Sequence, residues 1–175
     1  ASGITAGDIL QNVYGKKSGA IAAKINGEQK DMSFVVNENC KIEPILGDSE
    51  EGLYILRHSC AHLLAQAVVE IFPGAKPTIG PPIEHGFYYD FHMNPIGDSD
   101  LKIIEKRMNQ LVRENIKIKR EEFENNELRE MFQNNKFKIE ILDEKIGDEV
   151  GSTAYRQGDF IDLCRGPHVP STSHL

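Results

Sequence analysis

Two pairs of residues in this chain combine types and spacing that could do chemistry. His58 and His62 are four residues apart in HSCAHLL, so on a helix their side chains lie one turn apart on the same face. Cys164 and His168 have the same spacing in CRGPH, where Gly-Pro predicts a turn. Together the four could hold zinc tetrahedrally, or could orient and deprotonate water. The alternative is that they are polar residues flanking a buried helix, with no chemistry.

A long helix and a strand must position these two pairs. From Leu53 apolar residues recur at helical spacing until Pro73-Gly74 stops the pattern, so the first pair lies inside a helix. The second pair comes at the end of a strand predicted at 159–164. Between them the sequence predicts a loop, a tight turn and a strand at 87–91, a helix at 98–116, a shorter helix at 128–132, a strand at 137–142 and a polar acidic loop.

The first 47 residues are predicted to form a separate small α+β unit. A helix begins after Thr5, a residue type that caps helices, and short strand-like runs flank the turn signal Asn26-Gly27. A polar break bounded by glycines at 47–52 separates this unit from the rest. We therefore predict an α+β fold with two domains, at 1–47 and 48–175.

Composition restricts the class of protein. With 39% hydrophobic and 27% charged residues, the chain is typical of soluble globular domains. It has neither a run of about 18 apolar residues nor a basic-then-apolar leader, so we expect no membrane partner and a cytoplasmic location. The three cysteines, Cys40, Cys60 and Cys164, are an odd number, which argues against a disulfide scaffold and leaves each as a thiol or a ligand.

Net charge argues against a general nucleic-acid binder. The formal charge is −7, whereas phosphate contacts need clustered lysine and arginine. The dense basic stretch KIKR, at 117–120, is either the solvated end of the preceding helix or a local surface that approaches nucleic-acid phosphates.

Three longer strings give the sequence a family resemblance. HSCAHLLAQAV, IGPPIEHGFYYDF and FIDLCRGPHVPST, at these separations and behind a small domain, resemble the amino-terminal region of threonyl-tRNA synthetases. The resemblance implies a small β-grasp-like domain of TGS type at 1–47, lacking its first hairpin. It also implies an α+β editing domain of threonyl and alanyl type at 48–175, with a long helix packed on an antiparallel sheet. The aminoacylation domain, with its ATP and catalytic zinc, is then absent from this chain.

The same resemblance implies hydrolysis of the ester in seryl-tRNA(Thr), which releases serine. The partners would be tRNA(Thr) mischarged with serine and the remainder of the synthetase. Energetics explains why such a site exists, because serine lacks one methyl of threonine and a pocket discriminates a missing methyl by only about 1–3 kcal/mol. A second pocket that admits serine and misplaces the threonine ester inverts the test.

The resemblance also implies roles for single residues. His58 and His62 suit the orientation or deprotonation of water near neutral pH. Lys138 matches the catalytic lysine of the family; the alternative is a surface lysine, and Lys136 lies two residues away on the same predicted strand face. Tyr89 matches a substrate-contacting position, unless it is packed core.

Asp162 and Cys164 share one face of the last predicted strand. We expect Asp162 to hold the α-ammonium of serine or to orient a histidine, with an ordinary strand acid as the alternative. Cys164 could be a nucleophile, a ligand or a wall of the serine pocket; we favour the wall, because an activated ester needs no acyl-enzyme. We expect His168 to hydrogen-bond substrate or water, and Cys60 to point away from the histidine pair. The other histidines are expected on the surface or in turns: His85, His92 and His174.

Zinc separates the hypotheses. A closed set of His58, His62, Cys164 and His168 would leave no position for water, whereas an open set would make a zinc hydrolase. The alanyl relatives carry zinc on such ligands and the threonyl branch works without it, so the resemblance favours editing with no metal and no cofactor. The alternatives are a zinc-dependent deacylase, and a tRNA-binding module with a structural zinc site.

Overall fold

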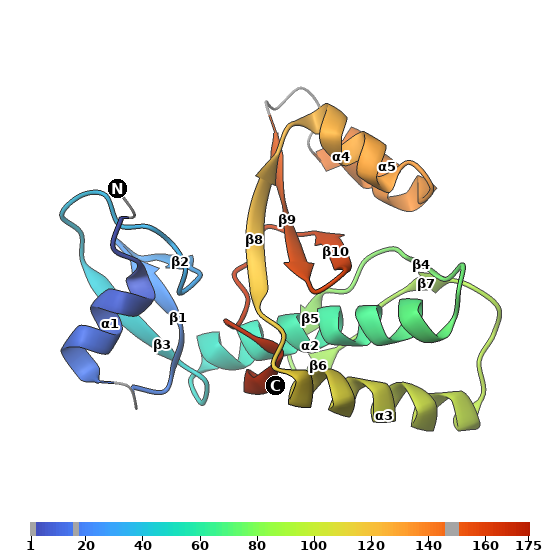
Figure 1. The fold of residues 1–175 in the computed structure, drawn as a ribbon, viewed down its shortest axis with the longest axis horizontal. Coiled ribbons are helices and arrows are strands. Elements are labelled where there is room, and N and C mark those ends of the chain that lie inside the picture. The colour runs from blue at the N-terminus through green and yellow to red at the C-terminus, as the bar shows by residue number, and fades with distance from the viewer. Residues whose placement is uncertain (1–2, 16–17, 146–150) are drawn as a thin grey trace.

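The computed structural model describes residues 3–15, 18–145 and 151–175. In Figure 1 the elements from α1 to β3 form a small unit beside a larger one, called the small and the larger domain below. Both domains mix helix and sheet, as the sequence predicts. In the small domain α1 (Ala6–Tyr14) packs on an antiparallel sheet of order β2-β1-β3, made of β1 (Ala20–Ile25), β2 (Glu28–Lys30) and β3 (Ile42–Leu46). The turn predicted at Asn26-Gly27 is confirmed, since both residues have positive φ between β1 and β2.

Local hydrogen bonds determine where the first two helices begin. The Thr5 side chain accepts a hydrogen bond from the Asp8 backbone N–H while the Asp8 carboxylate accepts one from the Thr5 N–H, a capping box at the start of α1. Ser49 caps α2 (Glu50–Ile71) by accepting from the Gly52 N–H at 3.0 Å. The predicted long helix is therefore present, and it begins three residues before Leu53.

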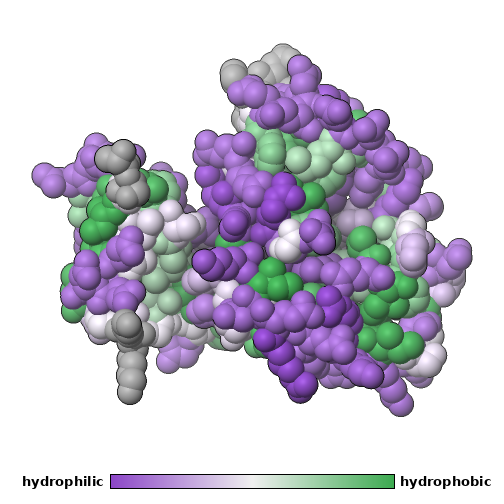
Figure 2. Space-filling view, viewed as in Figure 1, coloured by the Kyte–Doolittle hydropathy of each residue, from purple (hydrophilic) through white to green (hydrophobic). Residues whose placement is uncertain are grey.

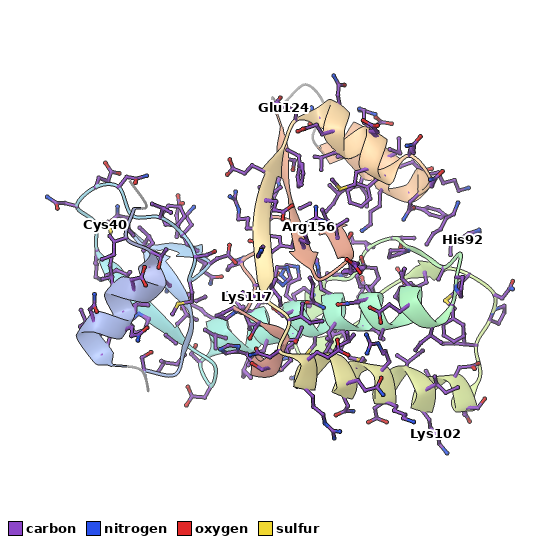
Figure 3. The ribbon with its side chains drawn as sticks, viewed as in Figure 1. Cys40, His92, Lys102, Lys117, Glu124 and Arg156 are labelled. Atoms are coloured by element: carbon purple, nitrogen blue, oxygen red, sulfur yellow. The ribbon has the colours of Figure 1, made fainter. Side chains whose placement is uncertain are left out.

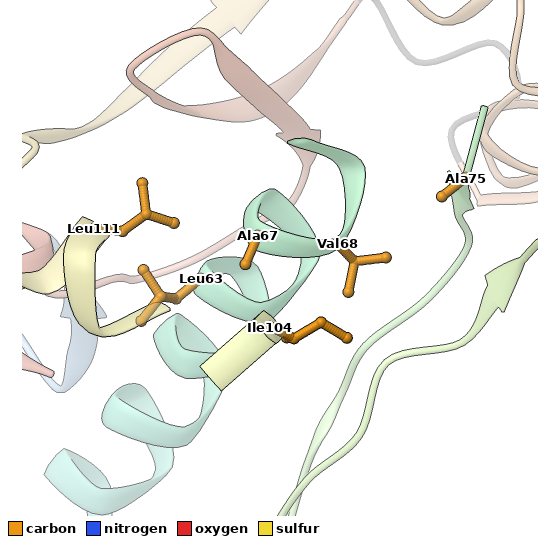
Figure 4. Close-up of a cluster of buried hydrophobic side chains, with 6 residues drawn as sticks. All are labelled: Leu63, Ala67, Val68, Ala75, Ile104 and Leu111. Carbon is orange, nitrogen blue, oxygen red and sulfur yellow. The ribbon is translucent and has the colours of Figure 1, made fainter. Parts of the chain in front are cut away.

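The core of the larger domain lies between α2 and α3 (Asp98–Glu114). Leu63, Ala67 and Val68 of α2 pack with Ile104 and Leu111 of α3 (Figure 4). Every buried residue of this cluster is at most 9% exposed, as expected for a closely packed interface between helices. One face of α2 packs against α3, and a neighbouring face presents the histidine pair to the sheet.

A three-stranded antiparallel sheet of order β10-β9-β8 stands over α2 (Figure 1). It consists of β8 (Ile118–Phe123), β9 (Ser152–Gln157) and β10 (Phe160–Leu163), with α4 (Asn125–Phe132) and α5 (Lys136–Lys145) beside it. Short strands pair as β4 (Lys76–Pro77) with β7 (Phe91–His92) and β5 (Pro82–Ile83) with β6 (Gly86–Phe87), and the chain ends in the 3-10 turn η1 (Thr172–His174).

The strand predicted at 137–142 is wrong, because this segment lies in helix α5. Its alternating apolar residues also satisfy a helical spacing, and Ile139 and Leu142 pack with Leu128 and Phe132 of α4. Asn135 starts the helix: its side-chain oxygen accepts from the Phe137 N–H at 3.2 Å. Tertiary packing of α5 on α4 therefore overrides the alternation.

The basic stretch at 117–120 is not the end of a helix. α3 ends at Glu114, Asn115 adopts the left-handed conformation, and residues 118–120 belong to β8. Figure 3 shows Lys117 at the lower end of β8, and the face around β8 is largely hydrophilic in Figure 2.

The strand predicted at 87–91 is reduced to the ends of β6 and β7, and β9 was not predicted at all. The predicted acidic loop after Leu142 falls partly on residues 146–150, which lie outside the described residues.

Within the ranges that the structure describes, none of the helices combines the length and the apolar character needed to cross a bilayer.

The close approach of α2 to β3 predicts an effect on stability. A Cβ at Gly52 would lie 1.8 Å from the Leu46 carbonyl oxygen, so Gly52→Ala must shift backbone and should lower the free energy of unfolding by about 1–3 kcal/mol. At Gly47 a Cβ would meet nothing nearer than 3.7 Å, so Gly47→Ala should stay within about 0.5 kcal/mol of the parent chain. Urea unfolding of both variants is the measurement, and equal midpoints would contradict this packing.

Candidate active site

Helix α2 presents the first pair of candidate residues. His58 and His62 follow each other by one turn, and their ring centroids lie 5.3 Å apart. His62 is 6% exposed, whereas His58 is half-buried. The spacing read from the sequence therefore places both imidazoles on one face, beside the sheet.

Strand β10 and the turn after it bring the second pair to the same place. Cys164 directly follows β10, and the Gly166-Pro167 turn folds His168 back behind it. The Cys164 Sγ lies 3.2 Å from the Nε2 atoms of both His58 and His168. One donor atom from each of the four side chains lies within 4.8 Å of the others. The two pairs thus converge, although they are far apart in the sequence.

Ser59 fixes the direction of the His168 ring. Its Oγ accepts a hydrogen bond from the Val169 N–H at 3.1 Å and lies 3.0 Å from the Nδ1 of His168. Both Ser59 and His168 are almost fully buried. The Nε2 of His168 therefore faces Cys164. Sequence reasoning missed Ser59, because a serine beside a histidine has no distinctive spacing.

A second polar cluster lies beside the first. The Lys138 Nζ is 2.5 Å from the Asp162 Oδ1 and donates to the Tyr89 hydroxyl at 3.2 Å, and that hydroxyl donates to the Asp162 Oδ2. The Asp162 Oδ2 also lies 4.0 Å from the Nε2 of His62. Lys138 is 2% exposed while Lys136 is exposed, so it is Lys138 that reaches the site. Tyr89 is both packed core and part of this cluster.

A cleft of about 480 Å³ opens over both clusters. Six of the predicted site residues contribute to its walls: His58, His62, Tyr89, Lys138, Asp162 and Cys164. The segment at 78–82 forms another part of the wall, with Tyr54 and Arg165 among the further lining residues. His168 is not among the lining residues of this cleft, and its Nε2 faces the Cys164 sulfur at 3.2 Å; its expected contact with substrate or water stays a prediction.

Burial keeps the imidazoles of the site neutral. Desolvation lowers the pKa of His62 to about 4 and outweighs the Asp162 carboxylate, which acts to raise it. Desolvation also lowers the pKa of His58, and it takes the pKa of His168 well below the usual value. At neutral pH these side chains therefore offer lone pairs and carry no positive charge.

Burial also keeps Cys164 protonated. Desolvation raises the pKa of its thiol to about 12, although the Gly166 N–H, which donates to the sulfur at 3.2 Å, opposes the shift. A thiol is a far weaker nucleophile than a thiolate, so the position favours a wall of the cleft. Binding of a metal ion would require loss of this proton.

The four converging residues suit two kinds of chemistry. Imidazole nitrogen and cysteine sulfur are ligands that zinc prefers, and donor atoms this close together fit around one ion. In that case the Ser59 hydroxyl would be the outer partner of His168. Without a metal, the same lone pairs can orient water, and Lys138 supplies positive charge within the same cleft.

The remaining histidines and cysteines lie outside the cleft. His85, His92 and His174 are exposed, as predicted. Cys60 does not line the cleft either, and Cys40 packs in the core of the small domain.

Comparison with known proteins agrees with this geometry. A family model described as the threonyl and alanyl tRNA synthetase second additional domain matches residues 153–175, which include Cys164 and His168. Similarity to individual proteins covers most of this chain, beyond the residues that the family model matches. The chain is similar to part of threonine–tRNA ligase. The protein of that name from Rubrobacter xylanophilus is 48% identical over 89% of this chain and 24% of its own length.

Two further relatives named threonine–tRNA ligase show the same relationship. The one from Thermoplasma volcanium is 48% identical over 89% of this chain and 23% of its own length, and the one from Streptococcus thermophilus is 45% identical over 99% and 27%. The chain therefore spans about a quarter of the length of the curated relatives it matches. The predicted resemblance to threonyl-tRNA synthetases is confirmed at this level, whereas the TGS assignment of 1–47 stays a prediction.

The buried ion pair predicts a large effect on stability. Lys138→Met leaves the Asp162 carboxylate buried without its cation and should cost about 3–5 kcal/mol of unfolding free energy. Adding Asp162→Asn should recover part of that loss, since the uncompensated charge is removed. Lys136→Met is the control, because its side chain is exposed and the change should stay within about 0.5 kcal/mol. Equal urea midpoints for the two lysine variants would refute a buried pair.

Proposed function

We propose that this cleft hydrolyses an aminoacyl ester and removes serine from tRNA(Thr) without a metal, as the editing part of a threonine–tRNA ligase. The observation that supports this most strongly is that His58, His62 and Cys164 share one cleft with the buried Lys138–Asp162 pair. Groups for water activation and for charge stabilisation are then available in one cavity. On this proposal residues 1–47 are a TGS-type domain and 48–175 the editing domain.

In the proposed reaction water attacks the carbonyl carbon of the ester. The water oxygen bonds to this carbon while the His58 imidazole takes the proton; His62, whose pKa of about 4 makes it a weak base, orients the water. Lys138 stabilises the developing oxyanion. The bond between the carbon and the ribose oxygen then breaks, and the ribose oxygen takes the proton back from the imidazolium. Asp162 holds Lys138 and receives the α-ammonium of serine.

Selectivity would follow from the shape of the wall. Cys164, as a thiol, offers an apolar surface to the small side chain of serine, and the added methyl of threonine would displace the ester or the water. A displaced water removes the reaction itself, so the preference should appear in the rate of the bound complex. This second selection on the side chain adds discrimination between serine and threonine beyond the about 1–3 kcal/mol that binding of one methyl provides.

Single-turnover deacylation tests this function. Seryl-tRNA(Thr) should be hydrolysed at least about tenfold faster than threonyl-tRNA(Thr) at saturating enzyme, because the methyl is sensed in the transition state. His58→Ala should abolish hydrolysis of both, since it removes the base. Cys164→Ala should be mild if the thiol is a wall and severe if it is the nucleophile. Equal rates for the two esters in the bound complex would place recognition of the methyl elsewhere.

Zinc hydrolysis is the second candidate, and the compact donor set of His58, His62, Cys164 and His168 favours it. Elemental analysis of the preparation used for deacylation separates the possibilities. Activity without metal supports the proposal. Activity that is lost with a chelator and regained with zinc supports a zinc-dependent deacylase, and metal without activity supports a tRNA-binding module with a structural site.

The tRNA partner predicts a role for the basic end of β8. Lys117, Lys119 and Arg120 are exposed, although Arg120 also pairs with Glu122 at 2.7 Å. If these residues bind RNA phosphates, reversing all three to Glu should weaken tRNA(Thr) binding and reduce the slope of log affinity against log salt by about one for each phosphate that is no longer neutralised. Lys102→Glu, at the far end of α3 in Figure 3, is the control. Unchanged binding and salt slope would show that the stretch is only a solvated surface.

A further inference from the structure

A carboxylate of the small domain reaches the turn that carries Cys164 and His168. Asp31 directly follows β2, and its Oδ1 accepts a hydrogen bond from the His168 backbone N–H at 2.9 Å. Its Oδ2 accepts one from the Tyr155 hydroxyl at 2.7 Å. One side chain from residues 1–47 therefore binds two elements of the candidate active site.

Both donors, the His168 N–H and the Tyr155 hydroxyl, lie in residues that pack directly behind the candidate active site. Tyr155 is 2% exposed, its ring centroid lies 4.4 Å from that of His168, and its strand position is opposite Asp162 in the β9–β10 register. The Tyr155 hydroxyl also fills the space beside Gly166, where a Cβ would come within 1.8 Å of it. Asp31 thus binds the turn directly, through the backbone N–H of His168, and indirectly, through Tyr155, which packs against the turn.

An apolar cluster also joins the two domains, beside this carboxylate. Ile21 and Ile45 of the small domain pack with Ile55 of α2 and with Val169 in an apolar cluster that spans both domains. Burial of apolar side chains such as these supplies most of the favourable free energy that holds packed elements together. The hydrogen bonds of Asp31 instead constrain direction: one fixes the backbone N–H of His168, and the other fixes the Tyr155 hydroxyl, which lies against Gly166 of the turn.

We propose that Asp31 is a positioning residue: through it the small domain sets the Cys164–His168 turn against the histidine pair of α2. The small domain then contributes to hydrolysis without touching substrate. Loss of outer hydrogen-bond partners that orient site residues typically costs about 10–100-fold in activity. The activity part of this inference rests on the proposed ester hydrolysis, whereas the geometric part does not.

The test uses the full 175-residue chain and three variants. Asp31→Ala should lower the maximal single-turnover rate on seryl-tRNA(Thr) about 10–100-fold, with little change in the enzyme concentration that gives half of this rate. Asp31→Asn, which keeps an acceptor oxygen, should have an intermediate rate. Asp8→Ala is the matched control: its carboxylate bonds Thr5 in the capping box of α1, in the same domain, and its removal should leave the rate near that of the parent chain.

Nuclear magnetic resonance of the same variants reads the geometry without activity. The backbone amide of His168 and the imidazole signals of His58, His62 and His168 should shift in Asp31→Ala and stay in place in Asp8→Ala. If Asp31→Ala leaves both signals and rate unchanged, or if Asp8→Ala reproduces its effects, the positioning role is refuted. A parent chain that hydrolyses no seryl ester sinks the proposed function alone, since the shifts still decide the role of Asp31.

Discussion

The buried carboxylate of Asp162 is the constraint on which the site depends. A charge at 1% exposure is tolerated only where partners compensate it, and here they come from two other segments: Lys138 of α5 and Tyr89 before β7. Satisfying one acid therefore draws three segments together. Lys138, Tyr89 and Asp162 form part of the wall of the cleft, so this electrostatic requirement helps to define its shape.

Desolvation then decides which protonation states the cleft offers. The same burial that makes the ion pair necessary lowers the histidine pKa values and raises that of Cys164 to about 12. The result is a set of neutral donors and acceptors beside one lysine and one carboxylate. Such a set can orient water and stabilise an oxyanion without a thiolate nucleophile, and it can also change character if a cation displaces the thiol proton.

Much of this arrangement could be predicted from local patterns. The helical spacing of α2, its two histidines and the turn after β10 are visible in the sequence, because periodicity, glycine and proline act over a few residues. The strand predicted at 137–142 failed because the same apolar residues fit both periods, and only the surface of α4 chooses between them. Strands β8 and β9 were missed, since their polar residues hide the alternation.

Other parts of the site could not be predicted, because they depend on contacts between distant segments. The spacing within KFKIEI does not distinguish Lys138 from Lys136; only the family resemblance indicated Lys138, and its burial against Asp162 depends on the formation of α5. Asp31 is separated from His168 by most of the chain, and no spacing connects them. The direction of the His168 ring depends likewise on Ser59. Long-range partners of polar groups are thus the information that short motifs lack.

The most direct measurement is a crystal structure of the chain with a non-hydrolysable seryl-adenosine amide. We expect the seryl group in the cleft, with its ammonium near Asp162, its side chain against Cys164 and its carbonyl carbon within reach of a water held by His58 and His62. Binding at another surface, or a seryl carbonyl directed away from both histidines, would contradict it.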